Sequence, residues 1–284
     1  MATSTSNSWD LVIEPPKGWF ALHLRDLWRY RDLVGLFVRR DFVASYKQTI
    51  LGPLWHVIQP LLTTLMFTVV FGRIAGLPTD AVPQFLFYMA GTTVWGYFSQ
   101  CLVQTSNTFI GNAGIFGKVY FPRMVVPVSV VMSRLIAFGI QFVFFLAVYA
   151  LFWARGAPIR PNWAIALLPL LLLLMAGMGL GFGIIISSMT TKYRDLQVLV
   201  GFGVQLWMYA TPVIYPLSTM GAKYRWVIVA NPMTAIVETF RYSFFGAGTF
   251  SWGYLGYTAG FTFVLIWLGM AVFNRVERTF MDTV

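Results

Sequence analysis

The chain has 284 residues, of which 58% are hydrophobic and only 11% are charged, and its mean hydropathy is +0.69. Soluble domains carry about a quarter charged residues, so this composition excludes an ordinary soluble protein and predicts a polytopic membrane protein. The net charge of +10 does not indicate a nucleic-acid partner, because Lys and Arg crowd the cytoplasmic ends of membrane proteins.

The N-terminal cytoplasmic segment covers residues 1–28. Its start, MATSTSNSWD, is polar and ends in an acid, with no basic region followed by an apolar core, so we expect no cleaved signal peptide. The next stretch, RYRDLVGLFVRRDFVASYKQT at residues 29–49, has charges at both ends and apolar residues such as Leu33 and Phe37 between them. It is too short and too charged to cross a bilayer. It therefore predicts an amphipathic helix over residues 29–46 that lies in the cytoplasmic membrane interface.

Six apolar spans follow, and each is long enough to cross a hydrocarbon core of about 30 Å, which takes about 20 residues. They cover residues 54–75, 84–106, 124–153, 164–189, 197–216 and 252–274, with boundaries good to a few residues. The sequence thus predicts an all-α integral membrane protein with one transmembrane domain over residues 29–278 and a cytoplasmic tail at 279–284.

The stretch between spans five and six, residues 226–246, is apolar but contains Pro232, Glu238 and Arg241. We interpret it as re-entrant helices at the outer face rather than as a seventh crossing. Glu238 and Arg241 are three residues apart, so one turn of helix can pair them as structural support for this segment.

The distribution of basic residues predicts the orientation. Six crossings place both termini on one side, where 13 Lys and Arg residues lie, against 6 on the other side, with Arg134 inside span three as the last of the 20. Cytoplasmic loops carry the excess of Lys and Arg. Both termini are therefore expected in the cytoplasm.

Residues 111–123, GNAGIFGKVYFPR, join spans two and three on the cytoplasmic side and contain a Gly-Lys pair after a glycine-rich run. A phosphate-binding P-loop needs two suitably spaced glycines, then Lys and a hydroxyl residue that holds Mg²⁺. Asn112 stands at the position of the first glycine and Val119 at that of the hydroxyl residue. The sequence therefore predicts no ATP site on this chain.

Other catalytic patterns are also missing from the sequence. The two histidines, His23 and His56, are far apart and form no metal-ligand pattern, and Cys101 is the only cysteine, so no disulfide framework is expected. Acidic residues in the spans are too few for a carboxylate proton relay. We expect no catalytic residue and no metal, and interpret the chain as one that binds and conducts.

Polar and aromatic side chains fall on one face of spans one and five. Span five carries Gln197, Gly201, Gln205, Met208, Pro212 and Tyr215 at spacings of 4, 4, 3, 4 and 3 residues, and span one carries Gln59, Thr63, Phe67 and Phe71. Such spacings place side chains on one side of a helix. Amides, hydroxyls and rings suit a sugar pathway, but small and polar residues also join membrane helices by packing, so both interpretations stay open.

Arg134 lies inside span three, where a charge is costly and usually faces protein or water. Two roles are open from the sequence: a structural pair with another helix, or attraction of a phosphate-bearing substrate.

Four segments in order resemble the type-2 ATP-binding-cassette exporter permeases, and in particular those that export O-antigen polysaccharides, teichoic acids and capsular polymers. They are RRDFVASYKQTILGPLWHVIQPLLTTLMFTVVFGRI (39–74), KVYFPRMVVPVSVVMSRLI (118–136), YRDLQVLVGFGVQLWMYATPVIYP (193–216) and NPMTAIVETFRYSFFG (231–246). Each segment alone is modestly specific, but together they extend the resemblance over about residues 31–278. The family fold has an amphipathic cytoplasmic helix, six crossings and re-entrant helices before the last crossing.

The resemblance implies a permease of the bacterial cytoplasmic (inner) membrane that works as a homodimer with two copies of a separate ATPase subunit. ATP and Mg would then bind to that partner subunit, and no cofactor to this chain. The implied substrate is a lipid-linked cell-surface polysaccharide of the O-antigen type with a diphosphate joint.

The resemblance also implies contact surfaces at the cytoplasmic face. The GNAGIFGKVYFPR loop, the 29–46 helix and the 190–195 turn would contact the ATPase. The candidate residues for this coupling are Arg31, Arg39, Arg40, Gly114, Gly117, Lys118, Lys192, Arg194 and Asp195. The candidates for attracting the anionic lipid head are Arg39, Arg40, Lys47 and Arg134, although the first three are also explained by positive-inside placement.

Alternative functions remain at this point. A teichoic acid or a small hydrophobic compound is the second choice of substrate within the same family. An ATP-independent channel or carrier would want intramembrane carboxylates or paired broken helices, which the spans do not clearly offer. An intramembrane transferase would need a catalytic acid or base, and none is evident.

Overall fold

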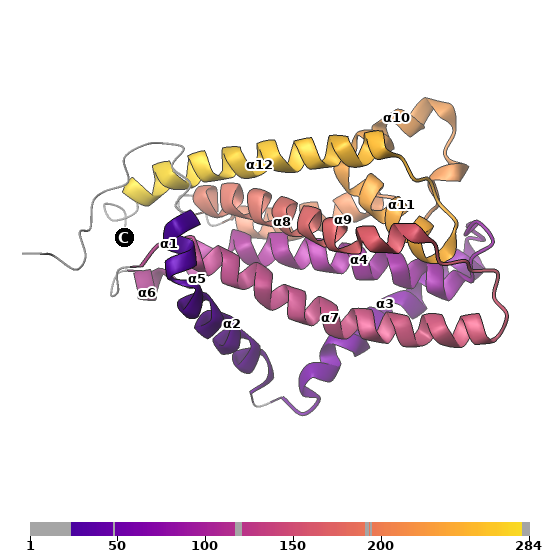
Figure 1. Cartoon of the computed structure of the whole chain (residues 1–284), viewed down its shortest axis with the longest axis horizontal. Helices are drawn as coiled ribbons and strands as arrows, with labels where there is room; N and C mark the ends of the chain where they lie inside the picture. The colour runs from indigo at the N-terminus through magenta and orange to yellow at the C-terminus, as the bar shows by residue number, and fades with distance from the viewer. Residues whose placement is uncertain (1–23, 48, 117–120, 191–192, 194, 280–284) are drawn as a thin grey trace, which may run out of the picture.

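The computed structural model describes residues 24–47, 49–116, 121–190, 193 and 195–279. Within these residues every regular element is helical, and the long helices run side by side as one bundle (Figure 1). We call the end of the bundle that holds α1 (Leu24–Arg29) and the last turns of α12 (Trp252–Thr279) the terminal end, and the opposite end the distal end.

The remaining elements follow in chain order. The first half contains α2 (Arg31–Tyr46), η1 (Gly52–Leu54), α3 (Trp55–Phe67), the π-helical η2 (Thr68–Ile74), α4 (Gln84–Ser106), α5 (Thr108–Gly111), α6 (Ala113–Phe116) and α7 (Val125–Ala154). The second half contains η3 (Trp163–Leu167), α8 (Leu168–Thr190), α9 (Leu196–Tyr209), η4 (Leu217–Thr219), α10 (Ala222–Ala230) and α11 (Pro232–Phe245) before α12.

Four helical segments are long and apolar enough to cross a membrane: Gly52–Ile74, Val125–Ala154, Trp163–Thr190 and Trp252–Arg275. They coincide within a few residues with predicted spans one, three, four and six. At predicted span two, α4 is a single helix of 23 residues, long enough to span about 34 Å. It carries more polar side chains than any one of these four segments. At predicted span five, α9 is an apolar helix of 14 residues.

The helix of predicted span five is shorter than the sequence indicates, since α9 ends at Tyr209. Pro212 follows, and proline has no N–H to continue a helix. The side-chain amide of Asn231 also donates to the Ala210 carbonyl (3.3 Å) and the Thr211 hydroxyl (2.8 Å), which stabilises the end of α9 from 20 residues away. Residues 210–216 are therefore a turn rather than the last part of the helix.

The stretch predicted as re-entrant, residues 226–246, lies within two short helices at the distal end (Figure 1). Asn231 separates them and accepts a hydrogen bond from the Met233 N–H (3.1 Å), with Pro232 as the first helical residue, an arrangement that starts α11 sharply. Gly246 ends α11 with a positive φ of 71°, a conformation that glycine adopts without strain. Nearly every residue of α11 is buried, whereas α10 is mostly exposed.

The Glu238–Arg241 pair predicted from the sequence is confirmed, with 3.5 Å between Arg241 Nη1 and Glu238 Oε1. Arg241 also donates to the carbonyls of Pro212 (2.5 Å) and Val213 (2.6 Å) in the turn after α9. The other carboxylate oxygen of Glu238 accepts from the Thr249 N–H at 3.0 Å. The pair thus joins α11 to the turn after α9 and to the loop that follows α11.

The core of the bundle is built on close contact between α4, α8 and α12. Two rows of glycine alternate along α8: Gly179 and Gly183 face α4, and Gly177 and Gly181 face α12. A Cβ atom on Gly179 would lie 2.5 Å from Cys101 Cβ, and one on Gly181 would lie 2.8 Å from Leu265 Cγ. Only glycine allows these backbones to approach so closely, as is common between membrane helices.

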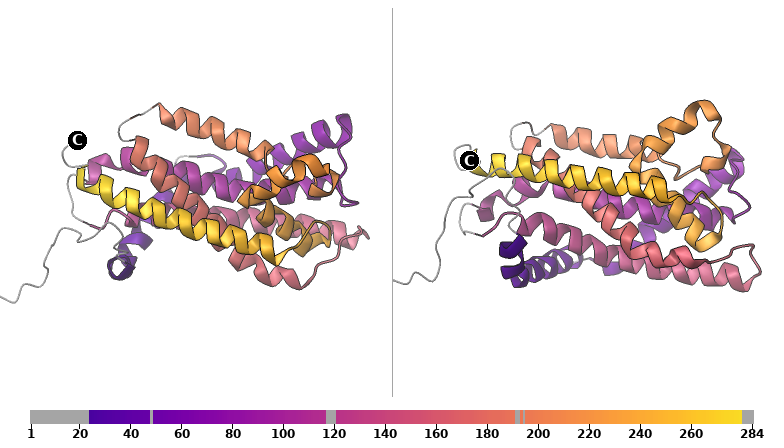
Figure 2. Two further views of the ribbon diagram at one scale, coloured as in Figure 1. Left: turned by 90° about the horizontal axis from the view of Figure 1, so that it is seen from above. Right: turned by 45° about the horizontal axis from the view of Figure 1, so that its top comes forward.

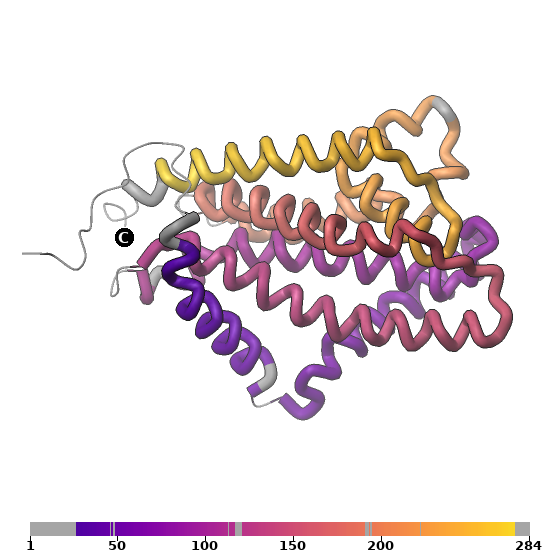
Figure 3. Tube along the Cα trace, in the orientation of Figure 1, coloured from indigo at the N-terminus to yellow at the C-terminus, as the bar shows by residue number. Residues whose placement is uncertain are grey.

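The N-terminal helix α2 leaves the terminal end obliquely, and α3 returns the chain to the bundle (Figure 3). Phe37 is the buried anchor of α2, at 6% exposure, and its ring lies 5.7 Å from that of Phe121. Leu36 on another face is 60% exposed. The helix thus has one face on the protein and leaves an apolar residue exposed.

Candidate functional site

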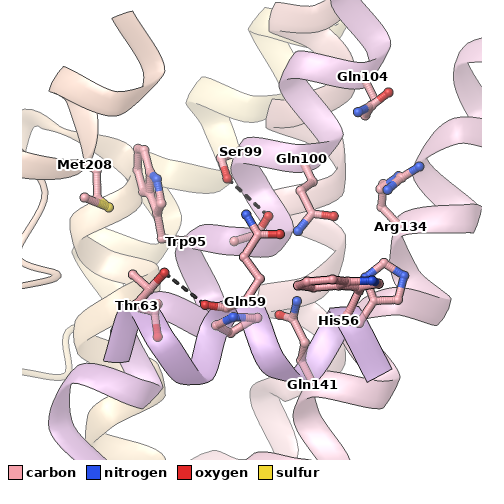
Figure 4. Close-up of a pocket in the computed structure, with 14 residues that line it drawn as sticks. His56, Gln59, Thr63, Trp95, Ser99, Gln100, Gln104, Arg134, Gln141 and Met208 are labelled. Atoms are coloured by element: carbon pink, nitrogen blue, oxygen red, sulfur yellow. Dashed lines mark hydrogen bonds between the residues drawn. The ribbon is translucent and has the colours of Figure 1, made fainter. Parts of the chain in front are cut away.

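A cavity of about 490 Å³ lies between α3, α4 and α7 and reaches Met208 of α9 (Figure 4). Its lining is mostly polar and aromatic, in a bundle that is otherwise strongly apolar. It is formed by Trp55, His56, Gln59, Pro60, Thr63, Thr92, Trp95, Gly96, Ser99, Gln100, Gln104, Arg134, Gln141 and Met208.

One face of α3 forms the first wall. His56, Gln59 and Thr63 follow at spacings of three and four residues, so they project to the same side of the helix. The Thr63 hydroxyl donates to the main-chain carbonyl of Gln59 at 3.1 Å (Figure 4). The side chain of Gln59 also lines the cavity. Behind this wall the hydroxyls of Thr64 and Thr92 are hydrogen-bonded at 3.1 Å and hold α3 against α4.

The opposite wall is one face of α4, which the sequence reasoning missed. Thr92, Gly96, Gln100 and Gln104 recur every four residues along the cavity, with Trp95 and Ser99 beside them. This stripe is readable in the sequence of span two by the same spacing rule that was applied to spans one and five. Gln141 of α7 adds another amide, and its side chain is only 5% exposed.

Aromatic rings support the wall near Met208. Trp95 packs edge-to-face on Phe98 (5.3 Å between centroids) and on Trp207 (6.1 Å). The Trp207 indole N–H donates to Asn231 at 3.2 Å, so its orientation is set by the residue that also starts α11. Amide groups beside a fixed aromatic face suit a ligand with hydroxyls on one side and C–H groups on the other.

Arg134 lines the cavity on the side where His56 and Gln104 also lie (Figure 4). Its Nε atom is buried and has no hydrogen-bond partner among the described residues. No ion pair joins it to a carboxylate in that part of the chain. Of the two roles that the sequence leaves open, the structural ion pair with another helix is therefore not seen among the described residues.

The structure brings four predicted residues together in this cavity: Gln59, Thr63, Met208 and Arg134. Phe67 lies outside it, packed on Phe71 (5.3 Å) and Tyr88 (6.3 Å). Tyr215 lies beyond the end of α9, where its hydroxyl donates to the Tyr209 carbonyl at 3.2 Å. The single face predicted from Gln197 to Tyr215 therefore does not continue past Tyr209.

The other predicted residues of span five lie away from the cavity as well. Gln205 and Gly201 are exposed, Gln197 is half-buried, and no atom lies within 4 Å of a Cβ built on Gly201. Both views of Figure 2 show α9 along the outside of the bundle. This face of α9 is thus open in a single copy of the chain.

The predicted coupling residues that the structure describes lie toward the terminal end. Arg31, Arg39 and Asp195 are exposed, and no atom lies within 4 Å of a Cβ built on Gly114. The lipid-head candidate Lys47 is exposed just after α2. The remaining coupling candidates, Gly117, Lys118, Lys192 and Arg194, lie outside the described residues.

Hydrogen bonds join two of the predicted coupling segments to each other and to α8. The half-buried Arg40 is paired with Asp41 (2.8 Å), and its Nη2 donates to Asn112 (3.4 Å), which ties α2 to the loop after span two. The Phe109 N–H of that loop donates to the Ser187 hydroxyl (3.2 Å) near the end of α8. A displacement of the loop would therefore alter its hydrogen bonds to both α2 and α8.

Comparison with known proteins gives a family match over most of the chain. The model of the family described as ABC-2 type transporter matches residues 32–245. The O-antigen export system permease protein RfbA of Klebsiella pneumoniae is 28% identical over 253 residues, which cover 88% of this chain and 94% of that protein.

Two further relatives have similar coverage. The O-antigen export system permease protein RfbA of Myxococcus xanthus is 28% identical over 264 residues, or 92% of this chain and 98% of that protein. The polysialic acid transport protein KpsM of Escherichia coli is 24% identical over 254 residues, or 86% of this chain and 93% of that protein. The similarity therefore covers the whole bundle and not only one motif.

Proposed function

We propose that this chain, which belongs to the ABC-2 type transporter family, is the permease subunit of an ATP-driven exporter that moves a lipid-linked, O-antigen-like polysaccharide out of the cytoplasm. It is an inner-membrane protein with apolar membrane-spanning helices. The observation that carries the proposal is the cavity of amide, hydroxyl and aromatic groups between α3, α4 and α7 of the apolar bundle. The relatives named for O-antigen export and polysialic acid transport support the choice of a polysaccharide.

The proposed topology has six crossings and cytoplasmic termini. α4 and α9 supply the two crossings beyond the four apolar segments, and the turn at residues 210–216 completes the path of α9 through the membrane. α10 and α11 form the re-entrant pair at the outer face. The distal position of these two helices and the basic residues toward the terminal end support this orientation.

The proposed assembly is a homodimer with two copies of a separate ATPase subunit, which binds the ATP and Mg. The open face of α9, with Gly201 and Gly203 free of neighbours, is suited to close approach by a second copy. The surface that carries α2, the loop after α4 and the start of α9 is suited to the ATPase. Movement of the ATPase subunits would then reach α8 through the contact between Phe109 and Ser187.

The test narrows the cavity in a cell that makes the polysaccharide. Thr63→Trp places an indole in the cavity, whereas Leu62→Trp, at a position that is 56% exposed, places the same group on the outside of the same helix. Thr63→Trp should abolish surface polysaccharide and leave lipid-linked glycan inside the cell, while Leu62→Trp should export at the normal rate.

Both variants must reach the membrane and bind the ATPase subunit in amounts equal to those of the unaltered chain. Normal export by a correctly assembled Thr63→Trp variant would show that the glycan does not pass through this cavity.

A further inference from the structure

The polar groups of the cavity are not evenly distributed along the bundle. Arg134 lies nine residues into α7 and Gln141 sixteen residues, which places Gln141 about 10 Å nearer the distal end. Gln104 lies two residues before the end of α4, near the terminal end. Arg134 and His56 thus lie toward the terminal side of the cavity. The uncharged Gln141, Thr63 and Thr92 lie nearer its distal side.

The lining contains a cation and several N–H donors but no acid. Among the described residues that form the cavity wall there is no Asp or Glu, so no carboxylate of this wall neutralises the charge of Arg134. A buried donor without a partner and a charge without a counter-ion are both unfavourable in a membrane protein. An anion at this position would remove both penalties at once.

From this arrangement we infer that the terminal side of the cavity is a binding site for the phosphate or diphosphate group of a lipid-linked molecule, with Arg134 as its principal contact. The guanidinium presents planar N–H groups that match phosphate oxygens. Gln100 and Gln104 supply neutral amide donors from α4, and His56 supplies a ring nitrogen from α3. This inference rests on the proposed export function and names the part of the substrate that this site holds.

The same arrangement sets the direction of the substrate. With the phosphate at Arg134, the first sugars would extend along Gln59, Thr63 and Gln141. The cavity wall there presents amide and hydroxyl groups and no charged side chain. A volume of about 490 Å³ lies within the range of about 300–1,000 Å³ that is usual for ligand pockets. The cavity is therefore large enough for the phosphate end of the molecule and its first sugars.

The experiment measures binding to the purified full-length chain in phosphatidylcholine nanodiscs. The probes are a polyprenyl diphosphate, phosphatidylglycerol and inorganic diphosphate, which separate the substrate carrier, an ordinary bilayer lipid and the free anion. The variants are Arg134→Gln and Arg134→Lys, with Arg155→Gln as the control at an exposed position at the distal end of the same helix.

The chain should bind the polyprenyl diphosphate more tightly than either other probe. Arg134→Gln should weaken this binding at least tenfold, Arg134→Lys less, because it keeps the charge without the planar fork, and Arg155→Gln not at all. Since Arg134 makes no ion pair within the described chain, Arg134→Gln should leave the melting temperature without ligand unchanged or raised. A purely structural arginine would instead lower that melting temperature.

Equal affinity of the unaltered chain and Arg134→Gln for the polyprenyl diphosphate would overturn the inference, and so would equally tight binding of phosphatidylglycerol. Because binding is measured without transport, these outcomes are separate from the export test. Loss of export in Thr63→Trp together with unchanged diphosphate binding in Arg134→Gln would refute the site and leave the export function standing.

Discussion

Arg241 is the most deeply buried cation in the described part of the chain, with 2% of its side chain exposed. Besides Glu238 and the carbonyls of the turn after α9, it contacts the Phe87 ring at 3.7 Å from the centroid. Burial lowers its pKa to about 10, an effect that Glu238 partly offsets, so the group stays protonated at neutral pH. One side chain thus satisfies carbonyls that no helix pairs and joins α4, α9 and α11.

Replacing Arg241 should therefore destabilise the distal end severely. Arg241→Met keeps similar bulk but leaves Glu238 as a buried charge without its partner, and removing one member of such a pair typically costs about 3–5 kcal/mol. We expect a large loss of folded protein and a lower melting temperature in detergent. Arg225→Met, on the exposed α10, is the matched control, and an equal melting temperature for the two variants would contradict this role.

At the scale of the elements, α8 is held by its two offset rows of glycine. The row that faces α4 and the row that faces α12 are two residues apart, so one helix lies in backbone contact with two neighbours. This arrangement predicts opposite results for chemically identical substitutions. A methyl group is unfavourable where a row meets its neighbour and harmless where the helix surface is open.

Gly179→Ala should lower the melting temperature, because the new Cβ would lie 2.5 Å from Cys101 Cβ and 3.2 Å from the Leu102 backbone nitrogen. Overpacking of this kind costs about 1–3 kcal/mol. Gly139→Ala in α7, with no atom within 4 Å of the new Cβ, should be neutral or stabilising, since alanine favours a helix over glycine by about 1 kcal/mol. Thermal unfolding of both variants in the same detergent tests the contrast, which fails if Gly179→Ala is as stable as Gly139→Ala.

The elements also show how far the sequence can predict this protein. Apolar length placed four segments within a few residues of their observed ends, because the thickness of the bilayer dictates that length. The end of α9 was not predicted, since it depends on Asn231, which lies 20 residues later and reaches back across the fold. The α4 side of the cavity was missed because span two was judged by its length and not by its stripe of Thr92, Gly96, Gln100 and Gln104.

At the scale of the whole molecule, the two ends of the bundle carry different elements. The terminal end carries α2 and the loop after α4, and the distal end carries α10 and α11. If the terminal end is cytoplasmic, as the basic residues indicate, a cysteine at each end should react from opposite sides of the membrane.

Cysteine labelling tests this orientation in a Cys101→Ser background, with Gly111→Cys at the terminal end and Lys223→Cys at the distal end. Both positions are exposed in the structure. In intact cells without an outer membrane barrier, an impermeant thiol reagent should modify Lys223→Cys at once and Gly111→Cys only after permeabilisation. The reverse pattern would invert the topology and move the proposed ATPase surface to the wrong side.

The unequal support of the cavity walls has a consequence for selectivity. α4 packs in the centre against α8, whereas Thr64 and Gly72 are the only buried residues of the first span, Gly52–Ile74. The width of the opening is thus set by where α3 lies and not by the packing of the core. We therefore expect the cavity to accept sugars of different size and linkage, and to select its substrate by the charged end of the molecule and not by the sugars along its length.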